Sequence, residues 1–396
     1  MAWITVIGIG EEGLTGLAPA LRTMIDTCDV LIGGQRHHEK VPEFTGERLN
    51  WDNGFDLALD EIEKRRGQAL VVLGSGDPLS YGVGSTLARR FGGDSLRVYP
   101  APGAFSLAAA AMAWSIPDSQ LLTIHGRPLE VLNLYLSPGA RLLVLSRDGG
   151  SPAQVAALLT AQGFGGSRIT VLENLGGETQ NQYDNKAEDW SFERASELNT
   201  LAIECVGDTA LSRAPGLPDD AFDHDGQLTK RQVRAATLAA LQPLPGQLLW
   251  DIGAGCGSVA IEWLRLGGHR RAVAFESNAD RLARIAHNAA NLGVPGLQIV
   301  EGTFPESAET KVPDAVFVGG GISQPGVLDA AWEALASGGR LVANGVTVQA
   351  EQTLAQFQTD HGGDLVRIGV ERAVPIGSKT AFKPMLRVTQ YAGTKP

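Results

Sequence analysis

The stretch WDIGAGCG, residues 250–257, decides the fold of this chain. Its first three residues end an apolar run, Gln247–Ile252, that predicts a strand. The residues after it, to about Leu266, have a pattern that predicts a helix. Its G-x-G-x-G spacing lets the backbone approach a ligand closely, and a helix N-terminus offers free N–H groups. A strand, a glycine loop and a helix in this order predict a ligand crevice at the carboxyl edge of a parallel sheet.

Two acidic residues flank this loop and indicate the kind of ligand. Asp251 directly precedes the glycines, where a carboxylate would repel a pyrophosphate but could bind an ammonium group or a hydroxyl. Glu276 follows the next expected strand, Ala272–Phe275, and could accept both hydroxyls of an unphosphorylated ribose. A ribose and a positive methionyl group describe S-adenosylmethionine better than NAD. A tight turn without a ligand is the alternative, and the agreement of strand, acids, glycines and helix argues against it.

The whole chain alternates apolar strand-like runs with helical patterns, which predicts α/β units and largely parallel sheets. We expect an N-terminal domain over 1–207 with lobes of about 1–117 and 118–207, a linker over 208–225, and a doubly wound C-terminal domain over 226–396. Thr229 is expected to cap a helix over Lys230–Leu241. The expected strands are Trp3–Ile9, Val30–Ile32, Ala69–Leu73, Leu96–Tyr99, Leu121–Ile124, Arg141–Leu145, Arg168–Leu172, Thr200–Glu204, Gln247–Ile252, Ala272–Phe275, Ile299–Val300, Asp314–Val318 and Arg340–Ala343.

Composition limits the partners. The 33 basic and 44 acidic residues give a net charge of −11, which argues against a general nucleic-acid-binding face. The three cysteines show no C-x-x-C spacing, so neither a disulfide framework nor a metal site is expected, and a reducing cytoplasm fits best. No stretch of ~18 apolar residues predicts a membrane span. We also expect a homo-oligomer.

The N-terminal half carries three further glycine loops. Gly8–Gly13 follows a strand and matches the dinucleotide fingerprint, but two acids stand where a pyrophosphate would lie, so NAD binding is rejected. Gly74–Gly82 and Tyr99–Ala104 follow two more strands and predict a ligand crevice. Asp77 could cap a helix that begins at Pro78, which would explain the acid without a ligand.

Three other features have both a functional and a structural interpretation. His125 ends an expected strand and could bind a carboxylate or shuttle a proton, and a backbone-bonded histidine in a turn is the equal alternative. Cys256 is interpreted as a small residue that fits its loop, although a helix N-terminus could lower the pKa of its thiol. His37 and His38 are expected on the surface, and Arg36 could contact an anion.

The motifs together resemble two known families joined head to tail. The strings ITVIGIG, LGSGDPLSYGVG, YPAPGAFSLAAAA, TIHGR, LVLSRDGGSPAQVAALL and ENLGG resemble the tetrapyrrole methylases, from residue 1 to about residue 207. The strings LTKRQVRAATLAAL, LLWDIGAGCGSVAIEW, AFESNADR, DAVFVGGG and GGRLVANGV resemble the small class I methyltransferases of corrin biosynthesis. The resemblance implies a two-lobed tetrapyrrole methylase fold followed by a Rossmann-like class I fold, and a role in cobalamin biosynthesis.

The resemblance also implies two S-adenosylmethionine sites and a tetrapyrrole substrate. The N-terminal half would methylate carbon 5 of the macrocycle, and the C-terminal half would methylate carbon 15 and remove carbon dioxide from the ring-C acetate. The candidate cofactor residues are Gly8, Gly76, Asp77, Pro78, Pro102 and Gly103 in the N-terminal half, and Thr229, Asp251, Gly253, Ala254, Gly255, Cys256, Gly257, Glu276, Ser277, Gly302 and Thr303 in the C-terminal half.

The reacting pocket of the C-terminal half is expected where further strands end. Gly319, Gly320, Gly321 and Asn344 are its candidate residues, and Lys230, Arg231 and Lys379 are candidates for binding substrate carboxylates. A reduced macrocycle is electron-rich, so alignment of carbon and methyl is the main task of the protein. Two alternatives stay open: a tetrapyrrole-binding protein with one active half, and an NAD-linked reductase.

Overall fold

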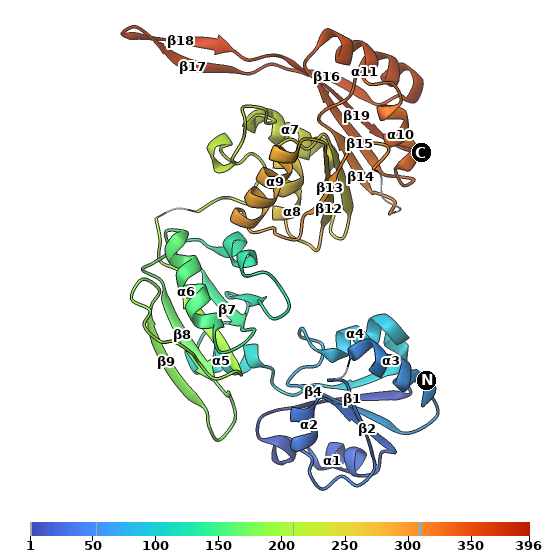
Figure 1. Ribbon diagram of the computed structural model, residues 1–396, viewed down its shortest axis with the longest axis vertical. Coiled ribbons are helices and arrows are strands. Elements are labelled where there is room, and N and C mark those ends of the chain that lie inside the picture. The colour runs from blue at the N-terminus through green and yellow to red at the C-terminus, as the bar shows by residue number, and fades with distance from the viewer. Residues whose placement is uncertain (1, 53, 209, 308–310) are drawn as a thin grey trace. The chain divides into compact units, whose positions relative to one another are not determined.

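The computed structural model describes residues 2–52, 54–208, 210–307 and 311–396, and it divides into two compact units (Figure 1). The first unit comprises Met1–Leu129 and Tyr135–Thr209, and the second comprises Glu130–Leu134 and Ala210–Pro396. In the ranges that the structure describes, no helix has both the length and the apolar character that a membrane crossing requires.

The first lobe of the N-terminal unit is a parallel five-stranded sheet in the order β3-β2-β4-β1-β5. Alternate residues of β1 face opposite sides of this sheet: Ile4 and Val6 join one core cluster, and Ile7 and Ile9 join the other. Burial on both faces explains why the strands read as continuous apolar runs. The elements are β1 Ile4–Ile9, α1 Pro19–Asp26, β2 Val30–Gly33, α2 Gln35–Glu39, β3 Glu47–Asn50, α3 Phe55–Lys64, β4 Leu70–Ser75, α4 Val83–Phe91 and β5 Leu96–Tyr99.

The second lobe corrects the expectation of parallel sheets. Its order is β6-β7-β10-β8-β9, and of its pairs only β6 with β7 is parallel in the described ranges. The strands β6, β7, β8 and β10 were expected, but β10 pairs antiparallel with both β7 and β8, and the unexpected β9 folds onto β8 as a hairpin. The elements are α5 Ala104–Met112, β6 Gln120–Thr123, β7 Arg141–Leu145, α6 Ser151–Ala161, β8 Arg168–Glu173, β9 Asn181–Lys186 and β10 Asn199–Glu204.

The second unit is a doubly wound domain, as predicted. Its sheet has the order β13-β12-β11-β14-β15-β19-β16; the five strands from β13 to β15 pair in parallel, and β19 pairs antiparallel with both β15 and β16. The chain leaves β11 toward β12 on one side and returns to β14 on the other, which creates a switch point at the carboxyl edge. The elements are α7 Arg231–Leu241, β11 Leu248–Ile252, α8 Ser258–Arg265, β12 Arg271–Glu276, α9 Ala279–Asn291, β13 Gln298–Glu301, β14 Ala315–Val318, α10 Val327–Ala334, β15 Arg340–Gly345, α11 Val348–His361, β16 Asp364–Ile368 and β19 Val388–Thr394.

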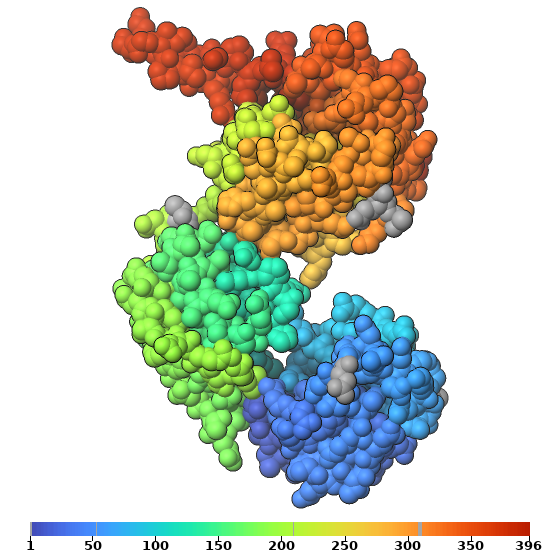
Figure 2. All heavy atoms as spheres, in the orientation of Figure 1, coloured from blue at the N-terminus to red at the C-terminus, as the bar shows by residue number. Residues whose placement is uncertain are grey.

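Between β16 and β19 the chain makes a hairpin of β17 (Glu371–Ile376) and β18 (Lys379–Pro384). This hairpin extends away from the rest of the second unit, as the red ribbon and the red spheres show (Figures 1 and 2). Ile376 and Phe382 are large apolar residues that it leaves exposed. None of the four strands after α11 was predicted from the sequence.

The segment expected as a linker contributes to the second unit. Leu217 and Phe222 are buried in the core cluster that holds α7 and α8 against the sheet. These two apolar residues stand in a stretch rich in Asp, Pro and Gly, so they form no helix or strand period that the sequence could reveal. Of the remaining stretch, Thr209 lies outside the described residues.

Two expected helix starts are wrong. The N-cap of α7 is Lys230, without a side-chain cap, so Thr229 does not cap this helix. The helix expected from Pro78 begins at Val83 instead, because Asp77 Oδ1 accepts the backbone N–H of Leu79 (2.9 Å) and closes a local turn.

Candidate functional site

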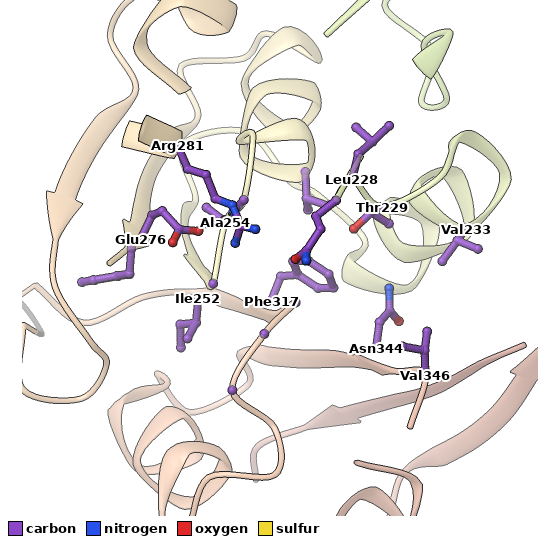
Figure 3. Close-up of a pocket in the computed structure, with 18 of the residues that line it drawn as sticks. Leu228, Thr229, Val233, Ile252, Ala254, Glu276, Arg281, Phe317, Asn344 and Val346 are labelled. Atoms are coloured by element: carbon purple, nitrogen blue, oxygen red, sulfur yellow. Dashed lines mark hydrogen bonds between the residues drawn. The ribbon is translucent and has the colours of Figure 1, made fainter. Parts of the chain in front are cut away.

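A cavity of about 860 Å³ opens at the carboxyl edge of the C-terminal sheet, beside the switch point. Figure 3 shows Glu276 and Ala254 at one end of it and Asn344 and Val346 at the other. The structure brings most of the predicted C-terminal site residues to this cavity: Thr229, Gly253, Ala254, Gly255, Glu276, Ser277, Gly302, Thr303, Gly319, Gly320, Gly321 and Asn344.

The three glycines of the 250–257 loop have positive φ angles but different surroundings. A Cβ at Gly253 would lie 2.8 Å from the backbone of Gly320, so this glycine lets the loops after β11 and β14 pack together. A Cβ at Gly257 would press on Ile285 at 3.0 Å. Gly255 has only Gln227 O, at 3.6 Å, near that position, so its backbone faces the cavity. Two of the glycines therefore allow close packing, and Gly255 leaves its backbone open to the cavity.

Asp251 does not line the cavity. It is 1% exposed, and its Oδ2 accepts the backbone N–H of Ala260 in α8 (3.0 Å). Its Oδ1 has no partner among the described residues. Burial, opposed by the bond from Ala260 and assisted by the charge of Glu276, raises the pKa of Asp251 to about 7. The carboxyl group thus joins the end of β11 to the first turn of α8.

Glu276 ends β12 at the edge of the cavity and is fixed by backbone donors. Its Oε1 accepts the N–H groups of Ser277 and Asn278, both at 3.0 Å. Its Oε2 accepts the N–H of Gly255 at 2.9 Å, which ties the glycine loop to this strand end. A carboxylate oxygen can accept about two hydrogen bonds, so Oε2 retains one acceptor position for a ligand hydroxyl.

Cys256 faces the interior of the unit rather than the cavity. It belongs to the core cluster around α8, and burial raises the pKa of its thiol. A thiol with a raised pKa stays protonated, and the thiolate is the nucleophilic form. The position therefore offers packing rather than nucleophilic chemistry.

The far end of the cavity holds an amide network. Asn344 Nδ2 donates to Thr237 Oγ1 (2.7 Å), and Asn344 Oδ1 accepts from Gln390 Nε2 (2.9 Å). Gln390 also donates to Thr237 Oγ1 at 3.2 Å. These bonds fix the plane of the Asn344 amide while the residue still lines the cavity.

One wall of the cavity comes from Gly226–Thr229, and sequence reasoning missed what holds it. Arg234 is fully buried; it donates to the carbonyls of Leu217 and Thr229 and to Glu262 Oε1 (2.6 Å). The guanidinium thus joins the segment before α7 to α8. In the sequence, Arg234 is only a basic residue within a helix pattern, and nothing there indicates its burial or its partners.

In the N-terminal unit, the loops after β1, β4 and β5 converge. Gly76 N–H donates to Ile9 O (3.0 Å), and Ala101 N–H donates to Gly76 O (3.1 Å). A Cβ at Gly8 would lie 1.9 Å from Gly76 O, and one at Gly76 would lie 2.7 Å from Gly103 Cα. Gly8, Gly76 and Gly103 thus let three strand ends close on one another, with Asp77, Pro78 and Pro102 in the same loops.

The remaining predicted residues lie elsewhere or at the margin. His125 is exposed in the N-terminal unit, and its backbone N–H donates to Thr123 Oγ1 (3.1 Å). Lys230 lines the C-terminal cavity, while Lys379 is exposed on the hairpin. His38 is buried, against expectation. Its ring contacts β3, where Nε2 lies 3.3 Å from Leu49 O.

The residues around the C-terminal cavity suit S-adenosylmethionine. Gly255 leaves open space where a side chain would stand, Glu276 retains an acceptor for a ribose hydroxyl, and the turn at Gly302 and Thr303 lines the same cavity. When bound, this cofactor supplies a methyl group on a cationic sulfur. The apolar residues Val346 and Val388 also line this cavity.

Comparisons with known proteins match the two halves of the chain to two different families. The family described as tetrapyrrole (corrin/porphyrin) methylases matches residues 4–190, and the precorrin methyltransferase domain matches residues 220–395. The chain is 47% identical over 398 residues to the precorrin-6Y C(5,15)-methyltransferase (decarboxylating) of Sinorhizobium sp, covering 99% of this chain and 96% of that protein.

Two shorter relatives each match 45% of this chain. One is the cobalt-precorrin-7 C(5)-methyltransferase of Salmonella typhimurium, 34% identical over 177 residues and 87% of its own length. The other is the Pyrobaculum calidifontis protein named "Probable cobalt-precorrin-6B C(15)-methyltransferase (decarboxylating)", 34% identical over 191 residues and 96% of its length. By the full-length match and both family domains, the chain belongs to the precorrin-6Y C(5,15)-methyltransferase (decarboxylating) family.

Proposed function

We propose that this enzyme methylates precorrin-6Y at carbons 5 and 15 and decarboxylates its ring-C acetate, giving precorrin-8X, in cobalamin biosynthesis. The observation that supports this most is the presence of two strand-end glycine-loop sites in two separately packed units of one chain. Each site would hold its own S-adenosylmethionine, so one chain would carry two methyl donors.

We assign carbon 5 to the N-terminal unit and carbon 15 with the decarboxylation to the C-terminal unit. The support is that relatives named for each of these activities match 45% of this chain apiece over nearly their own full lengths. Such relatives indicate that each activity needs only one unit.

In the C-terminal cavity, the chain has to align the macrocycle carbon with the methyl group and to exclude water. Holding the macrocycle carbon and the methyl group in line can contribute roughly 7–11 kcal/mol to the rate. Asn344, held by Thr237 and Gln390, offers a fixed amide to the acetate arm or ring. Val346, Val388 and their neighbours form apolar walls, and a dry environment favours loss of the carboxylate charge during decarboxylation.

The test separates the two units. Residues 210–396 and 1–207 are produced individually, and each is given precorrin-6Y and S-adenosylmethionine. Mass spectrometry should show one added methyl group and the loss of one carbon dioxide with the C-terminal piece. A product with two methyl groups, or one that retains the carboxylate, would contradict the division. Calorimetry on each piece should show one S-adenosylmethionine site, and a piece without binding would contradict the two-site proposal.

We further propose that the enzyme is a cytoplasmic homo-oligomer that does not bind nucleic acid. The net charge of −11 supports the last point, and three free buried cysteines suit a reducing compartment. The extended β17–β18 hairpin, with Ile376 and Phe382 exposed, supports self-association. Light scattering after gel filtration should give a mass above that of one chain, and a monomer at all concentrations would contradict the oligomer.

A further inference from the structure

A polar cluster stands at the carboxyl edge of the first sheet of the N-terminal unit, beside the converging glycine loops. Ser75 ends β4 directly before Gly76, and Arg36, His37 and Lys40 come from the segment after β2. Glu11 follows β1 and pairs with Lys40 Nζ at 2.6 Å and with Arg36 Nη2 at 3.5 Å. His37 was expected on the surface, but its ring is partly buried against Trp51.

The protonation of His37 follows from its two neighbours. The backbone N–H of Gly34 donates to His37 Nδ1 at 3.2 Å, so Nδ1 carries a lone pair and the ring proton lies on Nε2. Burial, together with the charges of Arg36 and Lys40, lowers the pKa of His37 to about 4, so the ring is neutral near pH 7. The Nε2–H group then donates to Ser75 Oγ, 3.0 Å away.

Ser75 Oγ thus has no free lone pair with which to accept a further hydrogen bond. It accepts from His37 Nε2 and also from Arg36 Nη2 at 3.1 Å, which occupies both of its lone pairs. Its hydroxyl hydrogen must therefore point elsewhere, and in the described part of the chain no acceptor receives it. Ser75 is exposed at the sheet edge, so this hydrogen is available to a ligand.

The charges around Ser75 define the ligand. Lys40 is engaged by Glu11 at 2.6 Å and by Gly10 O at 2.7 Å, whereas Arg36 lies 3.5 Å from Glu11 and its side chain is 43% exposed. A hydroxyl that can only donate, next to an exposed guanidinium, suits an anionic oxygen acceptor. A carboxylate is the acceptor that both ligands of the proposed reaction carry: the methionyl end of S-adenosylmethionine has one, and the tetrapyrrole has several.

We propose that Ser75 and Arg36 bind a ligand carboxylate in the N-terminal unit, and that His37 is the positioning residue that orients the Ser75 hydroxyl. This inference rests on the proposed function for the identity of the ligands. It makes the Arg36–His37 pair of the sequence part of the carbon-5 methylation site. No covalent bond is made or broken at these residues, since their role is to position the ligand.

The experiment uses the full chain and three substitutions. Ser75→Ala removes the donor, His37→Asn keeps an acceptor for Gly34 but removes the donor to Ser75, and His37→Gln restores a donor that can reach Ser75. Steady-state methylation at carbon 5 is measured with methyl-labelled S-adenosylmethionine and NMR of the product. Ser75→Ala and His37→Asn should raise one KM by about 10- to 100-fold with kcat within about twofold, and His37→Gln should lie close to wild type.

The KM that changes identifies the carboxylate. A raised KM for precorrin-6Y at saturating cofactor assigns it to the tetrapyrrole, and a raised KM for S-adenosylmethionine at saturating precorrin-6Y assigns it to the cofactor. Ser191→Ala, which removes an exposed hydroxyl from the segment between β9 and β10 of the same unit, is the matched control and should leave both values unchanged. Unchanged KM values in Ser75→Ala, or equal losses in His37→Asn and His37→Gln, would overturn the inference.

A binding measurement keeps this test independent of turnover. A polycarboxylate porphyrin and its fully esterified form are titrated into the wild type and Ser75→Ala, with quenching of porphyrin fluorescence as the signal. Weaker binding of the acid form alone, or a raised KM for S-adenosylmethionine, supports the carboxylate site. Equal binding of both forms by both proteins, with unchanged KM values, refutes it. Absence of carbon-5 methylation in the wild type would instead contradict the proposed function.

Discussion

Replacing Asp251 by asparagine should change how the stability of the second unit depends on pH. Burial raises the pKa of this carboxyl from 3.8 to about 7, so the folded state holds a proton that the unfolded state releases. The stabilisation from this group is complete below pH 3.8 and is lost as pH rises through 7. At ~1.4 kcal/mol per pKa unit, the shift corresponds to about 4 kcal/mol.

The substituted side chain in Asp251→Asn would not titrate, and its amide oxygen could still accept the N–H of Ala260. Its amide nitrogen would occupy the place of Oδ1, which has no partner among the described residues, and that cost does not vary with pH. The free energy of unfolding of Asp251→Asn relative to wild type should therefore rise by up to about 4 kcal/mol between pH 4 and pH 8.

Urea unfolding of residues 210–396 from both proteins, followed by tryptophan fluorescence at several pH values, measures this difference. Asp314→Asn is the matched control, because Asp314 also accepts a backbone N–H, from Leu248 (2.7 Å), but is only partly buried. A difference between Asp251→Asn and wild type that stays constant from pH 4 to pH 8 would refute the reasoning.

Three further substitutions test the site. Glu276→Gln should weaken S-adenosylmethionine binding to residues 210–396 by about tenfold or more in calorimetry, because an amide replaces a charged acceptor; unchanged affinity would remove Glu276 from the cofactor site. Arg234→Met should destabilise the second unit by about 3–5 kcal/mol in urea, because it leaves Glu262 buried without its charge partner; a loss below about 1 kcal/mol would contradict this. Thr237→Val should lower the rate of decarboxylation with unchanged cofactor affinity, because it frees the amide of Asn344, and an unchanged rate would exclude that network from the reaction.

Local pattern was sufficient for most of the framework. The parallel strands β1, β4, β11, β12 and β14 all lie where apolar runs predicted them, within one or two residues at each end. Their signal survives in sequence because both faces are buried. The exposed strands β16–β18 gave no such signal, since their residues are largely solvent-facing. The glycine loops were equally visible, because each follows directly on a strand.

The sequence by itself therefore determined the fold class, the family resemblance and the segments that meet at each strand-end site. Only the tertiary structure decided which side chains of those segments are buried and which hydrogen bonds they form. It placed Asp251 behind its loop, joined Thr237 to Gln390 across 153 positions, and aligned His37 with Ser75. The physical reason is that strands and turns depend on neighbours along the chain, whereas burial and side-chain hydrogen bonds depend on residues distant in sequence, which no local pattern records.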